Sequence, residues 1–319
     1  MRMNAIPDTP PNTNLQSVLH PAGWDAAIIS QFAWVLFIAG AVIFVAVMAL
    51  LVLSLRKQER PARALLWIGG GGIAFPVVVL TALLGWSTWR SAEMAPQSSR
   101  DALTISVTAK MWWWEVRYHD PATGREIVTA NEIHIPTGRA VYLGLNSADV
   151  IHSLWVPALA GKRDMVPGRV TGLTLRADKP GIYRGQCAEY CGEQHAKMAL
   201  HVVASAPADF DAWLARQALP AAAPSDPLLV RGREAYLAQR CQACHTIRGV
   251  DEGANLGPDL THVGSRMHIG AGTLKTHRAS LQGWIADPQA SKPGVFMPGS
   301  PELDRETLAA LAAYLEHLK

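Results

Sequence analysis

Charge is scarce in this chain of 319 residues, because only 17% of them are Asp, Glu, Lys or Arg. The formal net charge is +3, and no run of Lys and Arg forms a basic stripe. Binding to nucleic acid depends on such a stripe, so we expect no nucleic-acid partner. The sequence also lacks an internal repeat, and it contains little cysteine.

The chain has four cysteines, and two short motifs contain all of them. Residues 187–198 read CAEYCGEQHAKM, and residues 241–245 read CQACH. Each motif combines thiols with an imidazole, which are ligands of redox metals, and the two motifs differ in kind. A chain with two unlike redox centres is most simply a relay for electrons.

Long apolar runs are confined to the N-terminal part. Residues 28–55 are nearly free of charge, and a second apolar stretch covers residues 64–89. The first run is long enough to cross a hydrocarbon core of ~30 Å. The alternative interpretation is a signal peptide. The run is too long for the apolar part of one, and the residues before it are rich in Pro and Asn rather than basic.

Between the two runs lie Arg56, Lys57, Arg60 and Arg63, opposed by Glu59 alone. Basic residues in a short loop favour the cytoplasmic side of a membrane. We therefore predict a two-helix transmembrane hairpin in a bacterial cytoplasmic membrane. Both termini are expected on the outer, periplasmic side.

After the hairpin the pattern changes to short alternating segments separated by turn residues, as expected for an all-β sandwich. These segments are residues 103–108, 112–118, 132–135, 140–145, 171–176 and 198–203. A parallel α/β sheet is disfavoured, because no long amphipathic helices alternate with the predicted strands.

The C-terminal part has a helical pattern. A short helix is expected over residues 208–217, followed by Pro- and Ala-rich linker sequence, and further helices over 229–239 and 305–318, the last capped by Asp304. The predicted organisation has five parts. They are an N-terminal extracytoplasmic segment (1–27), a membrane hairpin (28–90), a β-sandwich (101–205), a short helix with a linker (206–227) and an all-α domain (228–319).

The first cysteine motif predicts a copper site. Thiolates suit copper(I), zinc or iron–sulfur clusters, whereas the thioether of Met198 favours copper over zinc. Two coppers that share the thiolates of Cys187 and Cys191 need a second imidazole besides His195, and His152 is the candidate. The alternatives are a structural zinc site and a Cys187–Cys191 disulfide.

The residues around this motif resemble cytochrome c oxidase subunit II. The resemblance rests on DVIHS at 149–153, GKRDMVPGR at 161–169, the Cys-x-Glu-x-Cys loop and the tryptophans at 112–114, and it extends to about residue 203. It implies a cupredoxin-like sandwich that holds a binuclear CuA centre.

The resemblance also implies a role for each matching residue. Cys187 and Cys191 would bridge the coppers, His152 and His195 would be terminal ligands, and Met198 and the Glu189 carbonyl would be weak axial ligands. The Glu189 side chain would bind magnesium beside subunit I. Trp112 would be the point of electron entry. One feature departs from the family. The start of the second apolar run has no acid after Glu59, so we assign no proton-channel residue.

The second cysteine motif is the attachment pattern of a c-type haem, with thioether bonds to Cys241 and Cys244 and with His245 as proximal ligand. Residues 226–319 resemble a class I cytochrome c, which implies Met297 as the distal ligand and a high haem potential. Other candidates for that ligand are Met267, His262, His268 and His277. In that fold the helix that carries Gly232 and Tyr236 crosses the terminal helix near Tyr314.

These inferences predict an electron-transfer subunit that passes electrons from haem c to CuA and on to a catalytic subunit I, which reduces oxygen. Expected partners are subunit I, subunit III, membrane lipid and an electron donor such as a cytochrome c or a quinol-oxidising complex. The alternatives are a CuA subunit of a nitric oxide reductase and a membrane-anchored copper chaperone. The chaperone has less support, because the sequence lacks a thioredoxin-like βαβ pattern.

Overall fold

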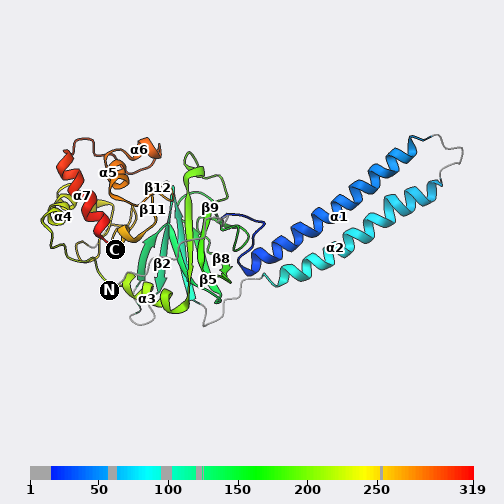
Figure 1. Cartoon of the computed structure of the whole chain (residues 1–319), viewed down its shortest axis with the longest axis horizontal. Coiled ribbons are helices and arrows are strands. Elements are labelled where there is room, and N and C mark those ends of the chain that lie inside the picture. The colour runs from blue at the N-terminus through cyan, green and yellow to red at the C-terminus, as the bar shows by residue number, and fades with distance from the viewer. Residues whose placement is uncertain (1–15, 57–62, 95–102, 120–123, 125, 252–253) are drawn as a thin grey trace.

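The computed structural model describes residues 16–56, 63–94, 103–119, 124, 126–251 and 254–319. Figure 1 shows three parts in chain order: a long helical hairpin, a β-sandwich and a helical domain on the far side of the sandwich. The predicted multidomain fold class is confirmed.

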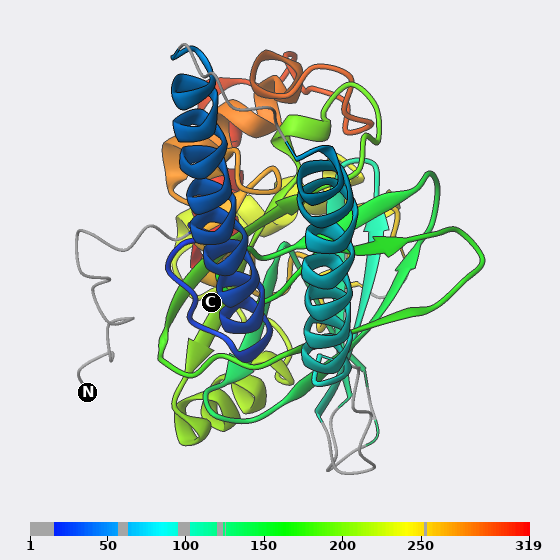
Figure 2. The ribbon, with the colours of Figure 1, turned by 90° about the vertical axis from the view of Figure 1, so that its right-hand side faces the viewer.

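The hairpin consists of α1 (Trp24–Ser54) and a second helix that starts as a π-helix (Leu65–Ala74) and continues as α2 (Phe75–Ala92). The two run antiparallel and lie side by side in both views (Figures 1 and 2). Both are long and apolar enough to cross a membrane. Of the connecting segment, Lys57, Glu59 and Arg60 lie outside the described residues.

The π-helical turns contain four consecutive glycines at 69–72, whose backbone is the least restricted of any residue type. The sequence pattern predicted only a helix here and gave no sign of the wider turn. Near the other end of the hairpin, Phe32 packs edge-on against Trp86 with ring centroids 4.8 Å apart. This contact joins the two helices near the sandwich.

The β-domain consists of two five-stranded sheets, with strand orders β3-β2-β1-β5-β8 and β4-β10-β9-β6-β7. The strands are β1 (Leu103–Lys110), β2 (Trp113–His119), β3 (Glu126–Ala130), β4 (Glu132–Pro136), β5 (Val141–Ser147), β6 (His152–Trp155), β7 (Arg163–Met165), β8 (Thr171–Leu175), β9 (Gly181–Cys187) and β10 (Ala199–Ser205). Alternate residues point into the space between the sheets, where Trp114, Leu143 and Leu200 are fully buried. Trp114 is thus a core residue.

The six predicted strands are confirmed, and β3, β6, β7 and β9 are additional. Strands β6 and β7 are too short to show a periodic pattern, and β9 has glycines at 181 and 185. These segments form strands because they pair with strands that are distant in sequence. In one such pair, Leu154 of β6 lies opposite Cys187 of β9.

The C-terminal domain packs its helices around a core of its own. Its elements, with the preceding helix α3, are α3 (Pro207–Gln217), α4 (Pro227–Ala238), η3 (Cys241–Ala243), η4 (Val263–Ser265), β11 (His268–Ile269), β12 (Leu274–Lys275), α5 (Arg278–Ala286), α6 (Pro288–Ser291) and α7 (Arg305–His317). The predicted cap is confirmed, since Asp304 accepts hydrogen bonds from the Glu306 and Thr307 amides. The small β11–β12 ribbon departs from a purely helical domain.

The predicted crossing of α4 and α7 is also confirmed. A Cβ atom at Gly232 would lie 2.1 Å from the Ala310 carbonyl oxygen and 2.6 Å from the Tyr314 Cβ. Only glycine lets the two backbones approach so closely.

Part of the predicted linker is hydrogen-bonded to the helical domain. The Ala221 amide donates to the Arg248 carbonyl at 2.9 Å, and the Leu219 carbonyl lies 3.0 Å from His262 Nε2. Proline and alanine are frequent in linkers, but their backbone groups still form hydrogen bonds where a surface offers partners.

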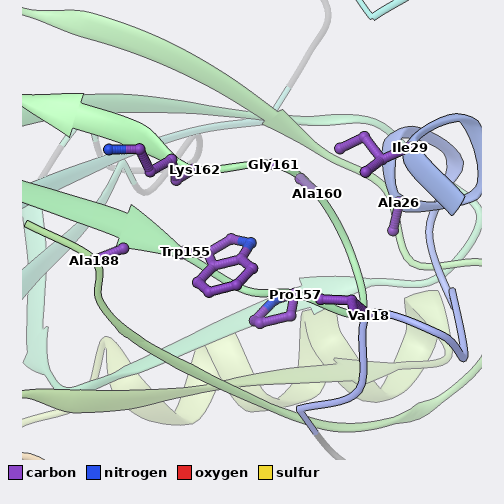
Figure 3. A pocket seen from close by; sticks show the side chains of 9 residues that line it. All are labelled: Val18, Ala26, Ile29, Trp155, Pro157, Ala160, Gly161, Lys162 and Ala188. Atoms are coloured by element: carbon purple, nitrogen blue, oxygen red, sulfur yellow. The ribbon is translucent and has the colours of Figure 1, made fainter. Parts of the chain in front are cut away.

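The segment before α1 is joined to the sandwich. The Ala22 amide donates to the Ala158 carbonyl at 2.7 Å, and the Ala22 carbonyl accepts from the Asp178 amide at 2.9 Å. A mainly apolar pocket lies at this junction (Figure 3), lined by Val18, Ala26, Ile29, Trp155, Pro157, Ala160, Gly161, Lys162 and Ala188. The start of the hairpin therefore has a fixed place beside the loop that carries the first cysteine motif.

Candidate metal and haem sites

The first cysteine motif forms a loop between β9 and β10 at one end of the sandwich. Cys187 ends β9, and the η2 turn (His195–Lys197) leads to Met198, directly before β10. His152 comes from the start of β6, whose residue Leu154 pairs with Cys187 across the sheet. Strand pairing thus carries the distant imidazole to the cysteine loop.

The sulfur and nitrogen atoms form an almost symmetrical arrangement. The Sγ atoms of Cys187 and Cys191 are 3.7 Å apart. His152 Nδ1 lies 3.8 Å from Cys187 Sγ, and His195 Nδ1 lies 3.6 Å from Cys191 Sγ. Each thiol therefore has one imidazole beside it, and the ligand atoms of His152, Cys187 and Cys191 all lie within 4.8 Å of one another.

Two weaker donors complete the site. Met198 Sδ lies 3.9 Å from Cys191 Sγ, and the Glu189 carbonyl oxygen lies 3.1 Å from Cys187 Sγ. A thioether and a carbonyl would be idle in a tetrahedral zinc site but are common weak ligands of copper–thiolate centres. The donor set present in this structure therefore fits copper.

The two thiols share their protons unequally. The hydrogen bond between the two thiols, opposed by burial, lowers the pKa of Cys187 well below its usual range. The same hydrogen bond, together with burial, raises the pKa of Cys191. A thiolate is the form of cysteine that binds metal, so this pair is prepared to bind a cation.

Asp149 orients His152, and the sequence did not assign it this role. Its Oδ1 lies 2.7 Å from His152 Nε2 and also accepts from the Val150 amide, while its Oδ2 accepts from the Met111 amide at 2.7 Å. An imidazole held at Nε2 presents Nδ1 to the thiols. The available signal was a carboxylate three residues before a candidate ligand.

Trp112 lies directly beside the copper loop. Its indole Nε1 donates to the Cys191 carbonyl at 2.8 Å, and a Cβ at Gly192 would lie 3.1 Å from the ring. The Glu189 carboxylate forms an ion pair with Lys162, whose Nζ lies 3.5 Å away. The role of Glu189 in magnesium binding stays a prediction.

The second cysteine motif lies on the short η3 turn after α4, and both of its cysteines are free. His245 Nδ1 lies 2.7 Å from the Pro258 carbonyl oxygen, which therefore accepts a hydrogen bond from the N–H at this nitrogen. The arrangement leaves Nε2 free to bind iron, and burial lowers the pKa of His245, which favours the neutral imidazole that binds metals.

A Cβ at Gly257 would lie 2.5 Å from His245 Cε1, so the backbone forms a cradle for the imidazole. Together with the free thiols, this environment fits a c-type haem. Met297 lies in the loop after α6, where its carbonyl accepts from Gln289 Nε2 at 3.4 Å, and its role as distal ligand stays a prediction.

Two of the competing histidines have other partners. His262 is buried, and its Nε2 lies beside the Leu219 carbonyl. His268 stacks on His201 of the sandwich, with ring centroids 4.6 Å apart.

Comparisons with known proteins agree with this geometry. Residues 115–205 match the family described as "Cytochrome C oxidase subunit II, periplasmic domain", and residues 229–319 match the cytochrome c family. The cytochrome c oxidase subunit 2 of Alkalihalophilus pseudofirmus is 34% identical over 247 residues, which are 77% of this chain and 70% of the relative. The corresponding protein of Bacillus subtilis is 30% identical over 257 residues, with the same coverage.

The crystal structure of the periplasmic domain of cytochrome oxidase subunit II from Bradyrhizobium japonicum is 29% identical. It covers 39% of this chain and 96% of its own, with a TM-score of 0.35. The donor set, the two matched regions and these two relatives lead to one conclusion: this chain belongs to the cytochrome c oxidase subunit 2 family and carries a cytochrome c domain after its copper-binding domain.

Proposed function

We propose that the sandwich holds a binuclear CuA centre, that the C-terminal domain holds a covalent haem c, and that electrons pass from the haem to the copper pair and on to subunit I. The observation that carries this proposal is the ligand arrangement at Cys187 and Cys191. One thiol pair, 3.7 Å across, with one imidazole beside each sulfur, would supply bridging and terminal ligands for two ions. When bound, the two groups accept and release single electrons.

The chain's own residues hold these groups and set their surroundings. Asp149 fixes the ring of His152, and the Pro258 carbonyl fixes that of His245. Cys241 and Cys244 would attach the porphyrin, and Met297 would complete the iron coordination. The Cys187 and Cys191 thiols are buried, which limits solvent access and so helps to set the potential of the centre.

Trp112 supports a defined route into the copper site, because its indole is hydrogen-bonded to the backbone of Cys191. We propose that electrons enter by this side chain. The Trp112→Phe variant, which lacks the indole N–H, should slow reduction of the copper centre while copper and haem contents stay unchanged. Unchanged kinetics would remove Trp112 from the route.

The proposed topology places both termini and both redox domains on the periplasmic side. Support comes from the basic residues between the two membrane helices and from the hydrogen bonds between Ala22 and the sandwich. The pocket at this junction adjoins both the hairpin and the copper loop, so we propose that this face meets subunit I. Subunit III, a shared magnesium ion at Glu189, and a cytochrome c or quinol-oxidising donor complete the proposed partners.

The decisive experiment is copper and haem analysis of the purified full chain, together with visible and near-infrared spectra. Two coppers per covalently bound haem, with the near-infrared band of a mixed-valence copper pair, are expected. The Cys187→Ser variant should lose the copper and keep the haem. A single zinc ion, or retention of both coppers by that variant, would contradict the ligand set.

A further inference from the structure

Trp112 also lies at a contact between the haem domain and the copper domain. The ring of Phe296 stacks on the Trp112 indole, with centroids 6.0 Å apart and an interplanar angle of 21°. Phe296 directly precedes Met297, the proposed iron ligand, and Trp112 is hydrogen-bonded to the backbone of the copper ligand Cys191. Two stacked aromatic rings therefore connect the neighbour of one proposed iron ligand to the backbone of a proposed copper ligand.

A buried lysine holds the same loop in place. Lys292 is only 1% exposed, and its Nζ donates to the Trp112 carbonyl at 2.8 Å and to the Gly270 carbonyl at 3.0 Å. A lysine is rarely buried unless its ammonium group has partners. Here one partner belongs to the sandwich and the other to the haem domain, so Lys292 ties the loop to the backbone of Trp112.

The surrounding backbone is shaped for this contact. Gly294 has a φ of +82°, and a Cβ there would lie 2.6 Å from Glu193 Oε2 in the copper loop. Lys197 Nζ donates to the Ser291 carbonyl at 2.7 Å, and the Ala199 amide donates to the Ala271 carbonyl at 3.0 Å. The contact between the domains thus includes hydrogen bonds and close backbone approach around the copper loop.

We propose that the segment 292–297 is an internal docking element, in which Phe296 covers Trp112 and Lys292 anchors the loop. Trp112 then receives electrons from this chain's own haem domain and is closed to other donor proteins, which must deliver their electrons to the haem. Each transfer oxidises the haem iron and reduces the copper pair by one electron. This inference rests on the proposed function, because it assigns the donor of Trp112.

Phe296 is well suited to a test, because 74% of its surface is exposed and it lies outside the core of the haem domain. Its replacement should therefore leave the domain folded. Phe296→Ala removes the covering ring, and Phe296→Tyr retains it as a matched control. Lys292→Met keeps an unbranched side chain of similar length but removes the hydrogen-bond donor.

The first measurement does not need electron transfer. The full chain is treated with a tryptophan-selective oxidant, and modification is mapped by mass spectrometry, with the fully buried Trp114 as an internal control. Trp112 should be as protected as Trp114 in the original protein and in Phe296→Tyr, and reactive in Phe296→Ala. In Lys292→Met the ratio of docked to undocked molecules should fall about tenfold, because the Trp112 carbonyl loses its partner. Equal protection of Trp112 in all four proteins would overturn the proposal.

The second measurement follows re-oxidation of the photoreduced haem in the oxidase complex. Phe296→Ala and Lys292→Met should slow electron transfer to copper several-fold at unchanged haem and copper potentials. The control variant Phe296→Tyr should keep the original rate. Unchanged rates in both variants would overturn the bridging role of the loop. If the original protein itself shows no transfer from haem to copper, the proposed function fails, whereas the protection of Trp112 is still measured independently.

Discussion

Replacement of Asp149 by Asn tests how the copper site is held together. The Asp149 carboxylate lies 2.7 Å from His152 Nε2 and accepts from the Met111 and Val150 amides, and His152 has no exposed surface. Asn has nearly the same shape, but one of its two terminal atoms is an NH₂ group that only donates. The variant therefore keeps the volume and loses either the bond to His152 or the bond to the Met111 amide.

The magnitude follows from the role of the lost bond. Removal of a group that orients a metal-bound histidine typically lowers metal affinity 10- to 100-fold, which corresponds to ~1.4–2.7 kcal/mol. The direct ligands are all retained, so copper should still bind. Its rate of loss to a chelator should rise by about the same factor, because such changes act mainly on dissociation.

The assay is competition with a copper chelator, followed by the visible and near-infrared absorption of the copper centre. Asp178→Asn is the matched control, because Asp178 forms a half-exposed ion pair with Arg176 and is expected to contribute little. Copper retention by Asp149→Asn equal to that of the control would refute the argument that this carboxylate positions His152.

Three further predictions follow from the same structure. Met198→Leu should keep both coppers and shift the reduction potential of the site, measured by redox titration, because a thioether is a weak ligand. Gly232→Ala should destabilise the haem domain by ~3 kcal/mol or more in thermal unfolding, because its Cβ would lie 2.1 Å from the Ala310 carbonyl oxygen. The stacked His201–His268 contact should weaken in acid, because burial, followed by the nearby His268, lowers the pKa of His201 from 6.5 to about 4. Domain docking, followed by amide hydrogen exchange of β11, should therefore be stable above pH 6.5 and be lost progressively as the pH falls towards 4.

Each of these predictions has a contrary outcome. Loss of copper from Met198→Leu would make the thioether a principal ligand. Gly283→Ala is the control for the crossing, because a Cβ at that helical position meets nothing within 4 Å, and equal stability of the two variants would contradict the close approach. Other groups also surround the histidine pair, namely Glu132, Arg184 and Lys275. Unchanged hydrogen exchange between pH 7 and pH 4 would show that these charges compensate for the protonation of His201.

The chemistry proposed for both sites could be inferred from the sequence, because most of the proposed ligands are close together in the chain. Cys187, Cys191, His195 and Met198 lie within twelve consecutive residues, and CQACH is a continuous motif. The apolar runs of the hairpin and the capped terminal helix are likewise set by local composition and periodicity. The close crossing at Gly232 was predicted from the resemblance to a cytochrome c.

Other features could not be predicted, because they depend on segments distant in sequence. Short strands such as β6 are strands only through their pairing partners, and the hydrogen bond from Asp149 to His152 depends on the loop conformation before that strand. The stacking of Phe296 on Trp112 joins residues 184 positions apart on two domains. Local sequence determined the helices and the residues proposed to bind metal and haem, whereas the packing of one domain on the other decided which aromatic side chains lie between the two proposed redox sites, because contacts between surfaces leave no periodic pattern in either segment.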